Sequence, residues 1–235
     1  AGADAYNTAV GYNAGLAVTT GIANVIMGGL AGDALTTGSN NVAVGFGALS
    51  AEDGHGRNVA VGNGTLQNQN AGSNAYNVAM GYEAGNDITT GTNNTLIGGL
   101  TGDALTSGAY NTALGYNALS TEDTGSRSVA IGWSALEDQN YDGESNNVAI
   151  GYGVAKQLTT GLQNVFVGAL AGDALTTGSS NIAIGYAAMS TANGAESRNV
   201  AIGQFALFAM DADGNNYNVA VGYDAGKAIT TGTLN

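Results

Sequence analysis

The stretch NNVAVGFGALS, from Asn40 to Ser50, decides the fold, because altered copies of it follow one another along the chain and its first half returns as NVAVG at Asn58. Its core is an Asn, three apolar or small residues, and a Gly. The three-residue run alternates with a period of two and is rich in β-branched residues, which indicates a short strand that the Gly ends. A Gly in every copy disfavours a helix. The repeat therefore predicts a chain built from many short strands.

Thirteen copies of this pattern occur at a nearly fixed spacing of 17 to 19 residues. Their first residues are Asn7, Asn24, Asn41, Asn58, Asn77, Asn94, Asn111, Ser128, Asn147, Asn164, Asn181, Asn199 and Asn218. A short fixed period is the sequence signature of a solenoid. Four copies make a longer repeat of 70 or 71 residues, which divides the chain into residues 7–76, 77–146, 147–217 and a partial copy at 218–235.

These periods predict an all-β fold: a parallel β-solenoid (β-roll) of about 13 coils of 17–19 residues, with two short strands and Gly-marked corners in each coil. Residues 1–235 are expected to form one continuous array, a piece of a longer fibre without caps. Stacked coils lie about 4.8 Å apart, so the amides of the repeated Asn residues can form a hydrogen-bonded ladder. Length varies in the polar half of the coil, as is typical of loops.

The strands are apolar on both faces. In NVAVG, Val42 and Val44 share one face and Ala43 takes the other. In the second coil of each long repeat, the middle position holds a larger side chain, namely Ile26, Leu96 or Phe166. A strand that is apolar on both faces needs burial on both faces, and one coil has only one interior. We therefore expect these three side chains to pack between the chains of an oligomer.

Composition excludes several classes of function. The chain has 18 acidic and 5 basic residues and a net charge of −13, which opposes binding to nucleic acid or to anionic membranes. Cysteine is absent, which excludes disulfides and thiolate chemistry. The single histidine, His55, is interpreted as a solvated loop residue and gives little basis for acid-base catalysis. We expect no enzyme, no catalytic residue and no bound cofactor.

Acidic residues recur in phase with the long repeat: Asp33, Asp103 and Asp173, and the pairs Glu52–Asp53 and Glu122–Asp123. Equivalent sites are four coils, or roughly 19 Å, apart, so they cannot share an ion within one chain. The stretch from Asp211 to Asn216 resembles a calcium loop in composition but lacks the downstream Glu. The composition of this stretch makes calcium the only ion that the sequence suggests, and we assign no metal site. Arg57, Arg127 and Arg198 are expected to pair with the acids just before them.

Two further columns of side chains suggest ligand binding. An aromatic residue follows the strand-ending Gly in eight coils: Tyr12, Phe46, Tyr82, Tyr116, Trp133, Tyr152, Tyr186 and Tyr223. Such a column could stack on sugars, but packing between coils or chains is the simpler interpretation. The motif TTG begins at Thr19, Thr36, Thr89, Thr159, Thr176 and Thr230. It invites an ice-binding interpretation, although adjacent residues of a strand point to opposite faces.

The repeats resemble those of two families. NVAVG, NVAIG and NIAIG, followed by a small residue such as Ala48 or Ala188, resemble the NSVAIG coils in the head domain of YadA-like trimeric autotransporter adhesins. NTAVGYNAG at Asn7 and NTALGYNALS at Asn111 resemble at least as closely the NTAVGYNAL-type arrays of bacteriophage tail fibres. The coils here are longer than the adhesin coil, and Val, Thr or Ile stands where the adhesins have Ser. The resemblance implies a homotrimer of β-rolls on a virion or cell surface.

The expected function is therefore a structural shaft of an extracellular trimeric fibre that mediates surface attachment or receptor binding, of the bacteriophage tail-fibre type. A bacterial surface adhesin or matrix filament of the YadA-like type is the alternative, and a glycan-, calcium- or ice-binding solenoid is a third hypothesis. The expected partners are two more copies of the chain and a receptor on a host or cell surface, which a glycan could provide. We expect no nucleic acid partner and no membrane insertion of this segment.

Overall fold

The structure is a computed structural model that describes residues 5–235. Its regular secondary structure in that range is a series of three-residue strands. They are β1 (Thr8–Val10), β2 (Val25–Met27), β3 (Val42–Val44), β4 (Val59–Val61), β5 (Val78–Met80), β6 (Thr95–Ile97), β7 (Thr112–Leu114), β8 (Val129–Ile131), β9 (Val148–Ile150), β10 (Val165–Val167), β11 (Ile182–Ile184), β12 (Val200–Ile202) and β13 (Val219–Val221). The chain is thus all-β, as predicted.

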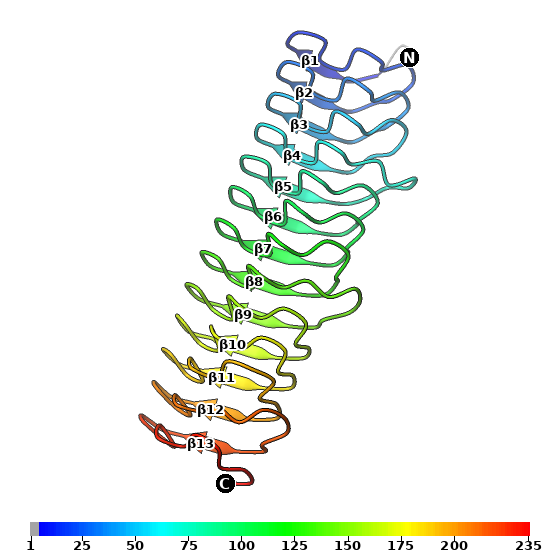
Figure 1. Ribbon diagram of the computed structural model, residues 1–235. Coiled ribbons are helices and arrows are strands. Elements are labelled where there is room, and N and C mark those ends of the chain that lie inside the picture. The colour runs from blue at the N-terminus through cyan, green and yellow to red at the C-terminus, as the bar shows by residue number, and fades with distance from the viewer. Residues whose placement is uncertain (1–4) are drawn as a thin grey trace. The chain divides into compact units, whose positions relative to one another are not determined.

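The chain divides into two compact units, of which the first ends at Ala113 and the second begins at Leu114. In the first unit β1 to β6 pair in sequence order, and in the second unit β8 to β13 do the same. All of these pairs are parallel, and each residue lies opposite its equivalent in the next coil. Within each unit the chain therefore winds as a β-solenoid, one coil after another (Figure 1). β7 lies at the boundary between the units.

The Gly that ends each strand is required because neighbouring coils approach closely there. Gly45 has a φ angle of 136°, and a Cβ atom on it would lie 2.2 Å from the carbonyl oxygen of Gly62 in the next coil. Gly62 has the same relation, also at 2.2 Å, to the carbonyl oxygen of Gly81. No larger residue fits at these two positions without moving the backbone. This contact explains the Gly of the repeated motif.

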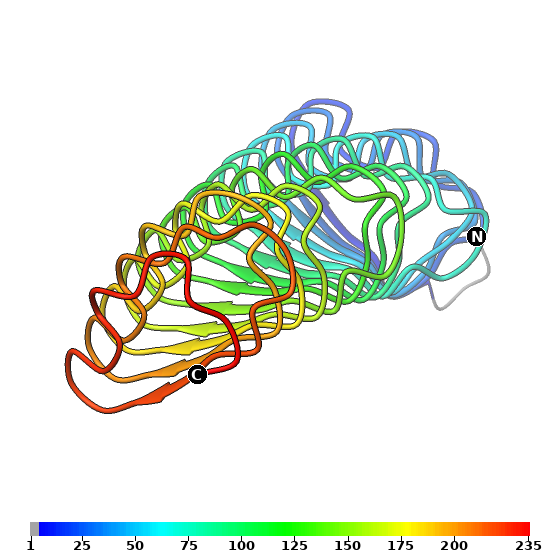
Figure 2. The ribbon, with the colours of Figure 1, turned by 60° about the horizontal axis from the view of Figure 1, so that its bottom comes forward.

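Each coil contains one strand, and the predicted second strand is wrong for the coils in residues 5–235. The rest of the coil consists of turns, which Figure 2 shows as loops beside the strands. Left-handed residues occur in these turns, such as Leu49 with a φ angle of 54°. The backbone still bonds from coil to coil, as from the N–H of Leu49 to the carbonyl of Thr65 at 3.0 Å. A left-handed residue interrupts an extended strand, so these bonds do not extend into a ladder.

The middle residue of each strand points into the coil. Ile26, Leu96 and Phe166 are therefore fully buried inside their own chain, which corrects their predicted role in packing between chains. These large side chains fit inside the coil because the turn after the strand has a glycine beside them. In Phe166's coil that turn holds Gly172, where a Cβ atom would lie 2.7 Å from the Phe166 ring. In the third coil, Ala43 stands in the middle of the strand and the buried Leu49 takes the place of the Gly, so the interior stays filled. In the fifth coil, which has Ala79, the Gly remains as Gly85, and a Cβ atom on it would lie 2.8 Å from Leu96 of the next coil.

The repeated Asn side chains join successive coils. The Oδ1 atom of Asn24 accepts a hydrogen bond from the N–H of Asn41 at 2.9 Å, and its Nδ2 atom donates to the carbonyl of Gly38 at 2.9 Å. In the second unit, Asn164 Oδ1 accepts bonds from both the N–H and the Nδ2 atom of Asn181, at 2.9 and 3.1 Å. These bonds supply partners to buried backbone groups at the corner of the coil.

Candidate functional site

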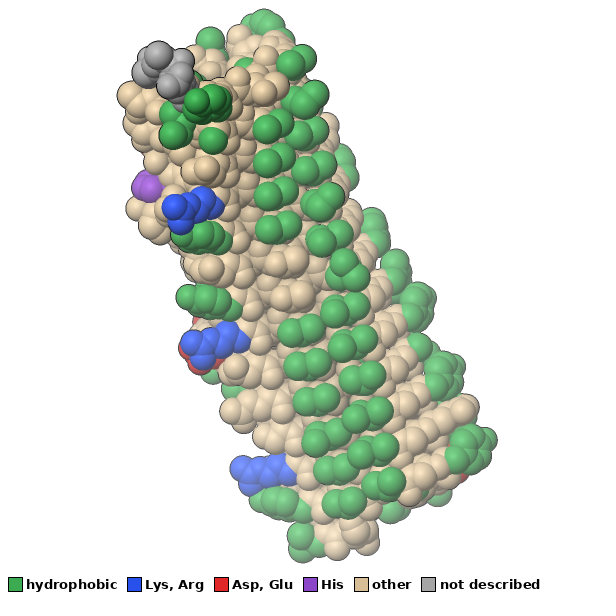
Figure 3. All heavy atoms as spheres, turned by 180° about the vertical axis from the view of Figure 1, so that it is seen from behind, with side chains coloured by type: hydrophobic (Ala, Val, Ile, Leu, Met, Phe, Trp, Pro, Cys, Tyr) green, Lys and Arg blue, Asp and Glu red, His purple; other side chains and the backbone are tan. Residues whose placement is uncertain are grey.

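The strands of each unit present an apolar surface, which we call the outer sheet face and which consists of the first and third residues of the strands. Its most exposed apolar members are Val10, Val25, Met27 and Met80 in the first unit, and Leu114, Ile150, Ile182, Ile184, Ile202, Val219 and Val221 in the second. Parallel register places equivalent residues side by side. Rows of hydrophobic side chains are visible on the coils in Figure 3. Contiguous exposed apolar surface of this kind marks an interaction site.

The aromatic column lies beside the strand-ending Gly residues and makes contacts between coils. The rings of Trp133 and Tyr152 are stacked with their centroids 4.9 Å apart, and Tyr186 meets Phe205 edge to face at 5.5 Å. The Nζ atom of Lys156 lies 5.3 Å from the centre of the Trp133 ring. The rings stay substantially exposed, for example 41% for Trp133 and 56% for Tyr152. The column therefore combines packing between coils with an open aromatic surface.

The arginine residues contact the next coil, so the predicted pairing with the preceding acids is wrong. Arg57 donates a hydrogen bond to the Tyr76 hydroxyl, and its guanidinium carbon lies 5.4 Å from the centre of that ring. Arg198 makes the same two contacts with the tyrosine of its next coil. Arg127 forms an ion pair with Glu144 at 2.6 Å. All three arginines have a positive φ angle, 63° to 66°, at a corner of the coil.

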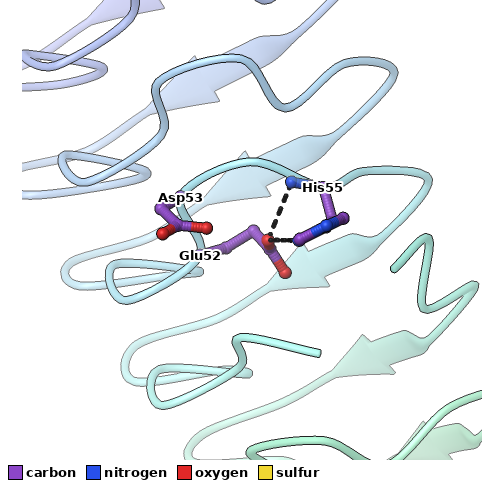
Figure 4. Close-up of side chains that lie close together, drawn as sticks. All are labelled: Glu52, Asp53 and His55. Atoms are coloured by element: carbon purple, nitrogen blue, oxygen red, sulfur yellow. Dashed lines mark hydrogen bonds and ion pairs between the residues drawn. The ribbon is translucent and has the colours of Figure 1, made fainter. Parts of the chain in front are cut away.

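The first acidic loop, which we define as residues 52–57, brings two acids and the histidine together. Glu52 is fully buried, Asp53 is exposed and His55 is partly exposed. One ligand atom from each of these side chains lies within 4.8 Å of the other two (Figure 4). Glu52 Oε1 accepts a hydrogen bond from the N–H of His55 at 3.0 Å and lies 3.5 Å from His55 Nδ1. Sequence analysis identified the acids but missed the burial of Glu52.

Two atoms of this loop are buried without a hydrogen-bond partner in residues 5–235, namely Glu52 Oε2 and His55 Nδ1. Burial raises the pKa of the Glu52 carboxyl above its ordinary value of 4.5, because the charged form loses its water. The hydrogen bond from the His55 backbone lowers that pKa in part. The loop thus holds a carboxyl group whose charged form is poorly stabilised.

The second acidic loop, residues 122–127, holds a buried Glu at the equivalent position, and its carboxylate is fully bonded. Glu122 Oε1 accepts a hydrogen bond from the N–H of Gly125 at 2.7 Å, and Oε2 accepts one from Gln139 Nε2 at 2.9 Å. The N–H of Tyr141 lies 3.4 Å from both oxygens. Burial raises the pKa of Glu122, and the hydrogen bonds, led by that from Gln139, lower it in part. Protein groups therefore take the place of water at this carboxylate.

The acids of the GDALT motif are partly buried. Burial raises the pKa of Asp103 and of Asp173 above the ordinary value of 3.8. The negative charges of Asp87 and Glu83 raise the pKa of Asp103 further. Asp103 therefore lies in a like-charged, partly desolvated setting and Asp173 in a partly desolvated one. Neither belongs to a cluster with histidine in the described part of the chain.

The calcium-like stretch and the TTG motifs use their polar groups within the fold. In the stretch from Asp211 to Asn216, the Oδ1 atom of Asp213 accepts a bond from the N–H of Ala195 at 3.0 Å. The Thr159 hydroxyl donates to the carbonyl of Thr176 in the next coil at 3.0 Å. Thr19 makes the same bond to its neighbouring coil. The hydroxyl of the leading threonine is thus engaged between coils in these two copies.

No pocket is found in residues 5–235. Over the same range, no helix has the length and apolar character needed to cross a membrane. Comparison of the chain with protein-family models, with curated proteins and with solved structures finds no match.

Proposed function

We propose that this chain is a shaft segment of an extracellular homotrimeric fibre of the bacteriophage tail-fibre type, which mediates attachment to a surface receptor. The outer sheet face carries the proposal. Parallel strands that are apolar on both faces are normally covered on both faces. In this chain the coil interior covers only the middle residue of the strands from β2 to β13, and residues such as Ile184 and Ile202, 36% exposed each, remain open.

A second and third copy of the same chain are the partners that fit this face best. Most coils repeat the same apolar pattern on this face, with Thr as the first strand residue in β1, β6 and β7. A copy in parallel orientation therefore offers matching columns, and a rotation axis along the columns closes the assembly. Complete burial of one fully exposed Val or Ile stabilises by about 1.5–3 kcal/mol, and side chains already partly buried, such as Ile184 and Ile202, gain a fraction of that. The gains summed over all the strands are needed to offset an association cost of roughly 4–15 kcal/mol.

The polar turns would then supply the recognition surface. They include the two acidic loops, and the polar turns of other coils vary in length, as in the 19-residue coils that begin at Asn58 and Ser128. Loops tolerate changes of sequence and length because the coil-to-coil bonds hold the scaffold. The YadA-like adhesin alternative uses the same kind of trimer, so the test of the trimer applies to both.

The mass of the chain in solution tests the proposal. Light scattering is expected to give about three times the chain mass of 23.1 kDa. The double variant Ile184→Lys with Ile202→Lys places two charges on the outer sheet face and is expected to dissociate the trimer. A matched control, Thr177→Lys, adds a charge in an exposed turn and is expected to stay trimeric. A stable wild-type monomer would contradict both the trimer and the fibre.

A further inference from the structure

We propose that the first acidic loop binds one Zn²⁺ ion through Glu52, Asp53 and His55. The three side chains converge in one loop, with one ligand atom of each within 4.8 Å of the others (Figure 4). Zn²⁺ binds nitrogen and oxygen at 2.0–2.2 Å, so two ligands of a tetrahedral ion lie roughly 3.3 Å apart. Glu52 Oε1 and His55 Nδ1 are 3.5 Å apart, which is long for a hydrogen bond and close to that ligand separation.

An independent observation points to a cation at this place. Glu52 is fully buried, yet its Oε2 atom has no hydrogen-bond partner in the described chain, and His55 Nδ1 is also buried without one. A buried carboxylate oxygen without a partner is costly, and natural proteins normally pair such a group with a donor or a metal. The one arginine of the loop, Arg57, contacts Tyr76 instead. The negative charge of the loop is therefore not neutralised by an arginine.

The ligand types favour Zn²⁺ over Ca²⁺ or Mg²⁺. Calcium takes six to eight oxygen ligands and magnesium keeps a shell of oxygens, whereas imidazole nitrogen suits zinc and its neighbours in the transition series. Two carboxylates and one imidazole give three protein ligands, and water completes the tetrahedron. Asp53 is exposed and the His55 side chain is 31% exposed, so an ion can reach the site from solvent. Such a site would stabilise the loop and fix its shape for recognition.

The same chain contains a matched loop that is expected not to bind. The second acidic loop has the same Glu–Asp pair, but it has Gly125 where the first loop has His55. Hydrogen bonds from Gly125 and Gln139 already occupy both oxygens of Glu122. A nitrogen ligand and a free carboxylate oxygen are thus present together in the first loop and missing together in the second.

Zinc titration of the full chain after chelator treatment tests the proposal. Calorimetry is expected to give one Zn²⁺ per chain, with at least tenfold weaker binding in His55→Gln, His55→Gly and Glu52→Gln. Asp123→Asn, in the second loop, is expected to bind like the wild type. Circular dichroism and urea unfolding of each variant verify that it is folded. Because two different substitutions replace His55, a folding defect in one leaves the other informative.

Nuclear magnetic resonance supplies a second readout. The chain has one histidine, so the imidazole signals belong to His55 alone. Zn²⁺ is expected to shift the Nδ1 signal, while the same concentration of Ca²⁺ leaves it unchanged. Absence of binding, equal affinity in the His55 variants, or a shift at Nε2 alone would overturn the proposal. These measurements count ions per chain, so their outcome is separate from whether the chain is a trimer.

Discussion

The two acidic loops share three of their six residues and lie at equivalent places in the repeat, but they surround their buried glutamate with different partners. Glu52 and Glu122 occupy equivalent places in successive long repeats, and both are fully buried. Glu122 receives hydrogen bonds on both oxygens, whereas Glu52 receives one, from the N–H of His55, and its Oε2 atom has no partner in residues 5–235. The repeat therefore determines where a side chain lies, and the residues of the neighbouring coils determine which hydrogen bonds it forms.

The difference arises from neighbours that the repeat does not preserve. Gln139 Nε2 donates to Glu122 and is also close to Ser128 Oγ at 2.9 Å and Ser145 Oγ at 3.2 Å. Its equivalent, Gln69, donates to the carbonyl of Thr89 at 3.2 Å instead. Two small hydroxyl side chains hold the Gln139 amide beside the carboxylate. The corresponding positions in the first unit hold Asn58 and Ala75.

The largest effect is expected from Gln139→Met. Methionine is the residue that the next long repeat has at the equivalent position, Met210. Glu122 would lose its strongest side-chain donor while staying buried, so unfolding free energy should fall by about 3 kcal/mol. Gln69→Met is the matched control and should cost about 1 kcal/mol, because no carboxylate depends on Gln69. Urea unfolding at fixed protein concentration measures both. Equal losses would show that the carboxylate network contributes nothing.

A smaller effect is expected from moving histidine into the second loop. A Cβ atom on Gly125 would lie 2.4 Å from the Glu122 carboxylate, so Gly125→His forces that side chain to move. Overpacking of this kind costs about 1–3 kcal/mol. The reverse exchange, His55→Gly, should cost less, since His55 is partly exposed. Thermal unfolding of the two variants compares them, and a larger loss for His55→Gly would contradict this account of the loops.

Much of the fold follows from the sequence, because the period of the motif fixes the coil length and the alternation fixes the strand. Which strand face is the interior does not follow from one coil, since both faces are apolar. The deciding signal is a paired exchange between coils: Ile26 with Gly32, against Ala43 with Leu49. A large strand residue accompanies a small turn residue, as expected only if both share one interior.

The burial of Glu52 and Glu122 could also be predicted by aligning the sequences of successive coils. Ten residues after the start of the strand, the second coil has Leu35 and the third coil has Glu52. The same column reads Leu105 and then Glu122 in the next long repeat. A position that holds leucine in one coil is an interior position in the next. The partners of each carboxylate could not be predicted, because they depend on how side chains from three coils fill the same space.

Replacing the buried glutamate by glutamine should change the free energy of unfolding in opposite directions in the two loops. Without metal at pH 7, Glu52→Gln eliminates a buried charge with an unpartnered oxygen and is expected to stabilise the chain by up to about 1 kcal/mol. Glu122→Gln places an amide opposite the Gln139 amide and is expected to destabilise it by about 1 kcal/mol. Chemical unfolding after chelator treatment gives both values. Changes of the same sign in both variants would remove the distinction drawn between the loops.

The smallest effect expected is in the pH dependence of stability. Burial raises the pKa of Glu52 above 4.5, so the folded chain binds this proton more tightly than the unfolded chain does. The resulting stabilisation is complete below the unfolded pKa and is lost as the pH rises through the folded pKa. Glu52→Gln should therefore reduce the fall in unfolding free energy above pH 4.5, in metal-free buffer. Zinc should reduce the same fall in the wild type, because it binds the deprotonated carboxylate. An unchanged slope in Glu52→Gln would mean that Glu52 keeps an ordinary pKa and that its burial does not govern the chemistry of the first acidic loop.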